Sequence, residues 1–472
     1  MPFSIYDTRQ RRKVPFETIE PGKVKMYTCG PTVYKDATIG NFRTYIFEDL
    51  LRRTLKYLGY QVMQVMNITD VDDKTINEAK LTGKPLNEIT KPVIEQFFRD
   101  IDLLNIERVE YYPLATQHVH EMIELIEKLL RSGNAYRMDD SIYFSITSFP
   151  EYGKLSGMKL NKLKCGVRID ADEYEKDDSR DFALWKGWTE DDGDVGWDSP
   201  FGRGRPGWHI ECSALSRKYL GEEFDLHTGG VDNIFPHHEN EIAQSVAATG
   251  KSYAQHWMHS AHLMVDGEKM SKSLGNVFTL TDLLNKGNSV RALRYVLMAT
   301  YYRHQLNFTN EAVSVANSSL KRLDTLYQAA KLASGSGAVR YLIQEKLEIT
   351  RDDFKSSLTD DLNISEALAA LFKLVTNVHQ AIGETALNRN EGIAIMDFWM
   401  DVDRVLGFLV SKETAFPDDI ALLIRERISL RCNRMFEKAD RFRDELAKKG
   451  FHLEDTSDGT VVIWQGGRKI IK

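Results

Sequence analysis

The stretch KVKMYTCGPTVYKDATIGNFRTYIFEDLLRRTLKYLGYQVMQVMNI, residues 23–68, decides the fold. Its first eight residues predict a short strand that ends in the turn Gly30-Pro31, and residues 61–68 predict a second, apolar strand. Between them, apolar side chains recur at helical spacing from Phe42 to Leu58, and Gly59 supplies the stop. Strand, helix and strand within ~45 residues form a βαβ unit, which implies a right-handed crossover and a parallel sheet.

Two polar segments follow the predicted strands. Residues 29–41 come directly after the first strand, and residues 69–74 come directly after the second. Ligands of open parallel sheets bind at the carboxyl ends of the strands. We therefore expect the functional site at these two segments.

The secondary-structure pattern and the charge of the sequence change several times along the rest of the chain. Residues 113–204 combine a helical stretch, a strand and an acidic run, which indicates an insertion into the first domain. Residues 309–412 show only helical patterning, and residues 413–472 begin with a basic helix and end in a small β element, TVVIW. The prediction is an α/β fold with a Rossmann-like parallel-sheet domain (1–112 and 205–260), an insertion (113–204), a linking region (261–308), an all-α helical bundle and a small C-terminal domain.

Composition narrows the class of protein. The 472 residues predict about three domains, and 42% apolar with 28% charged residues is ordinary for a globular chain. Four dispersed cysteines do not form a disulfide framework, which favours reduced thiols. Neither a signal peptide nor an apolar run of ~18 residues is present, so we expect a cytoplasmic protein without a membrane partner.

Four residues are candidate metal ligands: Cys29, Cys212, His237 and Glu241. Zinc prefers thiolate and imidazole, accepts carboxylate, and keeps one position open in catalytic sites. His237 and Glu241 are four apart after Pro236, so both are expected on one helix face, with His238 and Glu239 pointing elsewhere. From spacing alone, the alternative is equally plausible: buried apolar cysteines and a His/Glu pair at a helix surface.

Three loops have features of phosphate or nucleoside binding. KMSKS places Lys269 and Lys272 between Gly267 and Gly275, where they could neutralise phosphate charge, although a solvated loop is the default for such a run. In TIGN, Thr38 and Asn41 can donate hydrogen bonds, and Gly40 permits close backbone approach. GGVD offers Gly229, Gly230 and Asp232, a common turn that by itself is weak support for nucleoside contact.

Together these segments resemble the class I aminoacyl-tRNA synthetases, and specifically the cysteinyl-tRNA synthetases. The segments are CGPTVYKDATIGN (29–41), RPGWHIECS (205–213), GGVDNIFPHHENE (229–241) and KMSKS (269–273). Further matches extend over nearly the whole chain: NITDVDDK (67–74), DFALWK (181–186), DDLN (360–363) and ADRFRDEL (439–446). One departure is clear, because Thr38 and Asn41 stand where the class I pattern usually has two histidines, so neither can supply an imidazolium charge.

The resemblance implies a cysteine–tRNA ligase that uses ATP to make cysteinyl-adenylate and transfers cysteine to the 3′ end of tRNA(Cys). It implies one zinc ion per chain, because Cys29, Cys212, His237 and Glu241 match the family's ligands. The resemblance also implies four catalytic residues: Lys272, Lys269, Thr38 and Asn41. ATP, with Mg²⁺, is expected on Lys272, Gly40, Gly229, Gly230 and Asp232.

The resemblance also implies that Trp208 and His227 line the pocket for L-cysteine. Core packing of the tryptophan and a turn hydrogen bond of the histidine are the alternatives. Asp70, Asp72 and Asp73 stay unassigned, since carboxylates at a strand end are as often caps or lysine partners as magnesium ligands. The expected oligomeric state is a monomer.

A nucleic-acid partner is indicated locally. The whole chain has 62 basic and 69 acidic residues, a net charge of −7, yet residues 421–449 hold nine Lys or Arg against five acids. Such a basic helix suits phosphate contacts, although an ordinary solvated face is the alternative. By resemblance, residues 309–412 would contact tRNA and residues 413–472 would read the anticodon.

Two other functions remain open at this point. A cysteine ligase acting on a small-molecule amine could use the same site, but the helical bundle and basic segment argue against it, because a small acceptor does not need them. A tRNA-binding protein without catalysis is suggested only by the TIGN sequence.

Overall fold

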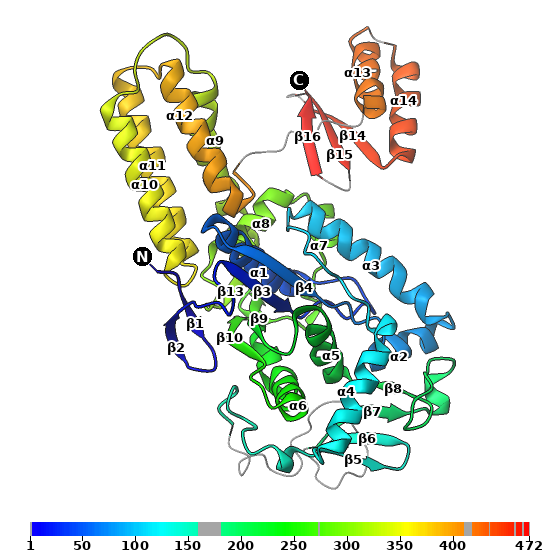
Figure 1. Ribbon diagram of the computed structural model, residues 1–472. Coiled ribbons are helices and arrows are strands. Elements are labelled where there is room, and N and C mark those ends of the chain that lie inside the picture. Colours follow the sequence, from blue (N-terminus) through cyan, green and yellow to red (C-terminus); the bar gives the residue numbers. More distant parts are fainter. Residues whose placement is uncertain are drawn as a thin grey trace.

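A four-stranded parallel sheet lies at the centre of the molecule (Figure 1). The computed structural model describes residues 2–158, 181–271, 274–409, 418–433, 435–456, 459–464 and 467–471. The sheet consists of β3 (Lys23–Thr28), β4 (Gln61–Met66), β9 (Phe224–Gly230) and β10 (Ala254–Ser260), in the spatial order β10-β9-β3-β4. Chain order reverses between β3 and β9, so the carboxyl ends of these two strands form the crevice where such sheets bind ligands.

Helix α1 (Ile39–Tyr57) makes the predicted crossover between β3 and β4. It begins at Ile39, three residues before the expected start at Phe42. Thr38, which has an extended backbone, is the N-cap residue of the helix. Both faces of the sheet are covered, as a parallel sheet requires. Met26 of β3 packs into a core with α1, whereas its neighbour Tyr27 packs into a second core with α5 (Trp208–Leu220).

The inserted segment forms a second sheet, which is antiparallel. Its strands are β5 (Ala135–Met138), β6 (Ser141–Phe144), β7 (Phe182–Gly187) and β8 (Gly204–Pro206). The predicted helix and strand are both present, as α4 (Val119–Arg131) and β6. The predicted acidic run lies outside the described residues except for Asp181, whose carboxylate accepts hydrogen bonds from Tyr136 and from the backbone of Ile146.

Four long helices follow the sheet region: α9 (Asn310–Lys331), α10 (Tyr341–Thr359), α11 (Ile364–Glu384) and α12 (Arg389–Leu406). The helical patterning of this region matches α9, where apolar residues three and four apart are buried. In α11, His379 is a packed helix residue whose Nδ1 lies 2.7 Å from the carbonyl oxygen of Val375. The helices form the elongated bundle in Figure 1, and α12 packs against α1. An all-α bundle behind an α/β domain is therefore confirmed.

The C-terminal part is a small unit of two helices and a three-stranded antiparallel sheet (Figure 1). The single basic helix that we expected is wrong, because α13 (Asp418–Cys432) ends and α14 (Phe436–Lys448) begins within that segment. TVVIW lies in β15 (Gly459–Trp464), as predicted, between β14 (Phe451–Thr456) and β16 (Gly467–Ile471).

The remaining α-helices and β-strands of the described residues surround these units. They are β1 (Ser4–Asp7), β2 (Arg12–Pro15), α2 (Asp73–Thr82), α3 (Leu86–Leu103), α6 (Glu239–Thr249), β11 (Leu263–Val265), β12 (Glu268–Lys269), α7 (Leu280–Asn285), α8 (Val290–Ala299) and β13 (Leu306–Phe308). Within the described ranges, no helix combines the length and apolar character needed to cross a membrane.

Candidate active site

A cavity of about 400 Å³ opens at the carboxyl ends of β3, β9 and β10. It lies at the point where the strand order reverses, as the βαβ pattern predicted. Eight of the residues expected at the site line it: Cys29, Thr38, Gly40, Asn41, Trp208, Gly230, Asp232 and Lys269. The structure therefore brings the three predicted loops to one cavity.

Four potential metal ligands meet at the inner end of this region. Ligand atoms of Cys29, Cys212, His237 and Glu241 all lie within 4.8 Å of one another. Cys29 directly follows β3, Cys212 lies near the start of α5, and the other two residues come from the turn before α6 and from α6 itself. Two thiols, an imidazole and a carboxylate form the donor set that zinc prefers, so these residues fit that ion.

The expectation that His238 points away from this cluster is wrong. Its Nε2 lies 3.2 Å from the Sγ of Cys29, and its Nδ1 lies 2.8 Å from the Nε2 of His259. His238 is three residues before Glu241, and positions i and i+3 share a helix face as i and i+4 do, so the Nε2 of His238 lies 4.0 Å from Oε1 of Glu241. Glu239 does point elsewhere, since its carboxylate accepts from the backbone of Gly153 and Ser156.

The position of His238 creates a second possible metal-binding set. Cys29 and Glu241 share it with His227 and His238, again with ligand atoms within 4.8 Å. The two sets differ in sulfur content, because the first has two cysteines and the second has one. Two thiolates favour zinc more strongly than a set with one thiolate and two imidazoles.

Burial and neighbouring charged groups shift the pKa values of three residues in the cluster. Burial raises the pKa of Glu241, but His227 and His237 outweigh burial and hold it well below its usual range. Burial lowers the pKa of His237, yet Glu241 and Cys212 raise it to about 10. In His238, burial followed by the field of His227 lowers the pKa well below its usual value. The cluster thus combines a carboxylate with a cationic imidazole, whose proton a bound metal would displace.

The TIGN residues lie at the first turn of α1. The backbone N–H and the hydroxyl of Thr38 both donate to Oδ1 of Asn41, at 2.9 and 2.8 Å. A Cβ at Gly40 would lie 2.3 Å from the terminal methyl of Met270, so the glycine gives that methionine room to pack on α1. Lys269 lines the same cavity, whereas Lys272 lies outside the described residues.

Two expected residues lie behind the cavity and do not line it. Gly229 is buried in β9, where a Cβ would lie 2.9 Å from the ring of His238. His227 is fully buried, and its Nε2 lies 2.9 Å from Oε2 of Glu241. Trp208, in contrast, lines the cavity with 42% of its surface exposed, and its ring stacks on His237 at a centroid distance of 4.4 Å.

Other lining residues were not foreseen as site residues. Tyr34, Lys35 and Lys74 lie at the cavity, with the Lys74 amine 5.8 Å from the Tyr34 ring centroid. Both lysines belong to motifs of the resemblance, CGPTVYKDATIGN and NITDVDDK, so the signal was present in the sequence. A cation at each position could contact phosphate groups.

The aspartates after β4 have structural partners. Asp70 accepts from the backbone and hydroxyl of Thr116, and Asp72 caps α2 by accepting from the backbone of Thr75. Asp73 pairs with Lys186 at 3.0 Å and with Arg205. The alternative of a cap and a cation partner accounts for Asp72 and Asp73, and Asp70 instead bonds Thr116.

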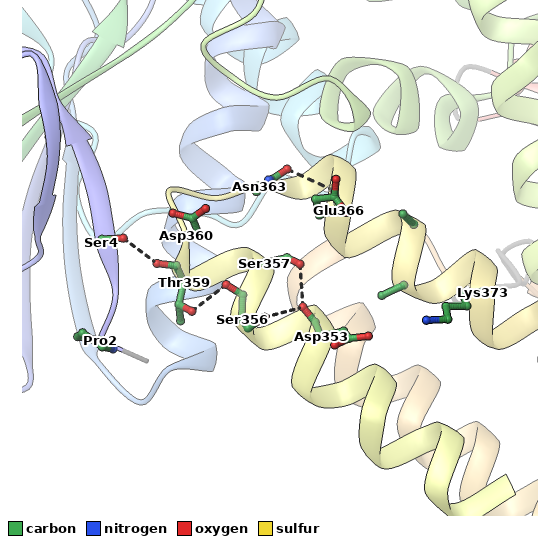
Figure 2. Close-up of a pocket in the computed structure, with 12 residues that line it drawn as sticks. Pro2, Ser4, Asp353, Ser356, Ser357, Thr359, Asp360, Asn363, Glu366 and Lys373 are labelled. Atoms are coloured by element: carbon green, nitrogen blue, oxygen red, sulfur yellow. Dashed lines mark hydrogen bonds between the residues drawn. The ribbon is translucent and has the colours of Figure 1, made fainter. Parts of the chain in front are cut away.

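A larger cavity, about 560 Å³, lies between β1 and the turn that joins α10 to α11 (Figure 2). Figure 2 shows Ser4 reaching the carbonyl of Thr359, and Ser356 and Ser357 bonding the carbonyl of Asp353. Of the predicted site residues that the structure describes, none lines this cavity. Size alone therefore does not identify the active site.

The fold and the site define the class of protein. Residues 15–318 match the family of "tRNA synthetases class I (C) catalytic domain". Among solved structures, the Mycobacterium tuberculosis methionyl-tRNA synthetase in complex with methionyl-adenylate superposes with a TM-score of 0.61 at 15% identity, covering 83% of this chain and 92% of that one. The chain has the class I aminoacyl-tRNA synthetase fold.

Sequence comparison narrows the class to one family. The chain is 47% identical to the cysteine–tRNA ligase of Brachyspira hyodysenteriae over 471 residues, covering 98% of both proteins. It is 46% identical to the cysteine–tRNA ligase of Chlamydia muridarum, covering 98% of this chain and 99% of that protein. The chain belongs to the cysteine–tRNA ligases.

Proposed function

We propose that this chain joins L-cysteine to tRNA(Cys) in two steps, with zinc held by Cys29, Cys212, His237 and Glu241. In the first step the cysteine carboxylate attacks the α-phosphate of ATP, which gives cysteinyl-adenylate and releases pyrophosphate. In the second, a ribose hydroxyl at the 3′ end of tRNA takes the cysteinyl group and AMP leaves. The observation that supports this best is the four-ligand cluster beside a cavity that the TIGN, GGVD and KMSKS segments border.

Selection of cysteine over serine needs chemistry as well as size. The two amino acids differ by one atom, and a pocket that measures size alone gains only ~1 to 3 kcal/mol from such a difference. Zinc on these four residues would supply a contact that favours a thiolate over a hydroxyl. Trp208 stacks on His237 and borders the cavity, so it can cover the substrate side chain next to the cluster.

Activation of ATP depends on positioning and charge. Thr38 and Asn41 lie at the N-terminal end of α1, where the helix dipole and free donors favour phosphate. Lys269 and Lys272 add positive charge for the phosphates together with Mg²⁺. Asp232, at the edge of the same cavity, can accept from the substrate ammonium or from a ribose hydroxyl, and Gly230 allows the nucleoside to approach the backbone.

The tRNA would extend from this cavity along the helical bundle to the C-terminal unit. Exposed basic residues in α13 and α14 suit phosphate contacts. The remaining expectations, a cytoplasmic location and a monomeric state, stay predictions, and sedimentation of the purified chain tests the second.

Cysteine-dependent exchange of pyrophosphate into ATP tests the first step without tRNA, and the metal content of the same sample tests the zinc site. We expect about one zinc per chain and exchange with cysteine, but not with serine. Exchange that does not distinguish the two amino acids, or a protein that is active without metal, would contradict the proposal. Charging of tRNA(Cys) compared with a small amine acceptor separates this function from the alternative ligase.

A further inference from the structure

The two carboxylate oxygens of Glu241 have different surroundings. Oε2 lies 2.9 Å from Nε2 of His227 and 2.9 Å from the hydroxyl of Tyr253. Oε1 lies 3.1 Å from Nε2 of His237 and 4.0 Å from the Sγ of Cys29. Oε2 therefore has two hydrogen-bond donors of its own, whereas Oε1 is directed toward the other potential ligands.

Tyr253 also connects this carboxylate with the helix turn that bears Cys212. Its hydroxyl lies 2.7 Å from the hydroxyl of Ser216, and the Ser216 oxygen also lies 2.7 Å from the carbonyl oxygen of Cys212, so the one serine hydrogen is shared between the phenol and that carbonyl. Tyr253, Ser216 and Glu241 are all buried, so water does not compete for these bonds. One phenol thus links the segments that hold two of the four ligands.

The direction of the hydrogen bond follows from the chemistry of the partners. An ionised carboxylate only accepts, so the Tyr253 hydroxyl must donate to Oε2. With donors from His227 and Tyr253, Oε2 is hydrogen-bonded, and rotation that brought it to a metal would break both bonds.

We propose that Tyr253 is a positioning residue which, with His227, holds Oε2 of Glu241 away from the metal, so that this carboxylate binds through Oε1 alone. This inference rests on the proposed zinc site. A carboxylate that binds through one oxygen leaves a coordination position for the sulfur of cysteine, which a carboxylate binding through both would occupy. The inferred role of Tyr253 is to keep that position open.

The test compares Tyr253→Phe with Tyr27→Phe. Tyr27 is a matched control, because its ring contacts His227 at 5.2 Å and its hydroxyl, also buried, has no hydrogen-bond partner among the described residues. In Tyr253→Phe, Ser216 keeps its bond to the carbonyl of Cys212 and Glu241 keeps its bond to His227, so no buried donor loses its only acceptor.

Each protein is loaded with Co²⁺, whose visible spectrum reports coordination number, and its zinc affinity is measured against a chelator. For Tyr253→Phe we expect zinc affinity about 10- to 100-fold weaker, an altered Co²⁺ spectrum, and a smaller spectral change on adding cysteine. In pyrophosphate exchange the KM for cysteine should rise while the KM for ATP stays constant. Tyr27→Phe should match the wild type in all these measurements.

Ser216→Ala gives a graded second variant, because it removes the neighbour of the phenol but leaves the bond from Tyr253 to Glu241. We expect its effect to lie between those of the two tyrosine variants. A Tyr253→Phe protein with wild-type spectrum and affinity would overturn this inference alone. A wild-type chain that takes up no Co²⁺ would overturn the proposed zinc site and this inference with it.

Discussion

The hydroxyl of Thr38 donates to the side-chain oxygen of Asn41 across 2.8 Å at the first turn of α1. The same oxygen accepts the backbone N–H of Thr38 at 2.9 Å, so it is engaged by the helix terminus. The amide nitrogen of Asn41 is then the atom of this side chain that can donate to a bound phosphate. A neutral donor at a helix N-terminus can bind an anion through the helix dipole without the charge of a histidine.

Substitution of Asn41 tests whether this amide works in catalysis. Asn41→Ala should lower kcat/KM for pyrophosphate exchange about 10- to 100-fold, since it removes one donor to developing charge. Asn41→Asp keeps an oxygen for Thr38 but replaces the donor with a negative charge, so it should be less active than Asn41→Ala although its helix end is intact. An aspartate variant as active as the wild type would show that the side chain serves only the helix.

The two candidate metal sets can be separated by substituting residues that belong to only one of them. Cys212→Ala or His237→Asn removes a ligand from the set that also contains Cys29 and Glu241, whereas His238→Asn affects only the alternative set. We expect the first two variants to lose most of their zinc after dialysis and the third to retain it. The reverse pattern of metal content would assign the site to His227 and His238.

Much of this site follows from the sequence, and the remainder depends on geometry that no spacing rule contains. The i, i+4 rule placed His237 and Glu241 together, and their Nε2 and Oε1 atoms do lie 3.1 Å apart. Applied only to residues four apart, the rule missed His238, because a residue three positions before Glu241 shares its helix face too. The role of Tyr253 could not be predicted. Its hydrogen bond to Glu241 joins the segment before β10 to α6, and such a side-chain contact produces no periodic pattern in the sequence.

A buried ion pair connects the active-site helix with the region that follows the KMSKS loop. Asp49 of α1 accepts from Arg294 of α8 at 2.6 Å and from Arg53 at 2.8 Å, while Arg294 also donates to the carbonyl of Leu406 in α12. Burial raises the pKa of Asp49, but Arg294 and Arg53 outweigh burial and lower it. The pair therefore holds α1, α8 and the helical bundle together.

Loss of this pair should weaken the fold in a pH-dependent way. Asp49→Asn should reduce the free energy of unfolding by about 3–5 kcal/mol at neutral pH, because it leaves Arg294 charged and buried. Because folding lowers the pKa of Asp49, its contribution is present above the unfolded value of ~3.9 and is lost as pH falls through the folded value. Denaturant unfolding at several pH values should therefore show the two proteins converging in acid.

An exposed pair provides the control for this measurement. Asp102 and Arg108 are 2.7 Å apart, with side chains 60% and 42% exposed, so Asp102→Asn should cost less than about 1 kcal/mol. If both asparagine variants lost the same stability, or if the effect of Asp49→Asn did not change with pH, the buried pair would not have the role described.

The basic residues of the C-terminal unit divide into two kinds, which predict different effects on tRNA binding. Arg427 is fully buried and bonds the carboxylate of Asp455 and the hydroxyl of Thr460, so it stabilises the unit. Arg425 and Arg441 are exposed, and each can meet a phosphate. Arg425→Gln or Arg441→Gln should weaken tRNA(Cys) binding and reduce the salt slope by about 1, with pyrophosphate exchange unchanged. Arg427→Gln should instead lower the melting temperature of the C-terminal unit, and a salt slope reduced by this variant without any loss of stability would contradict the division.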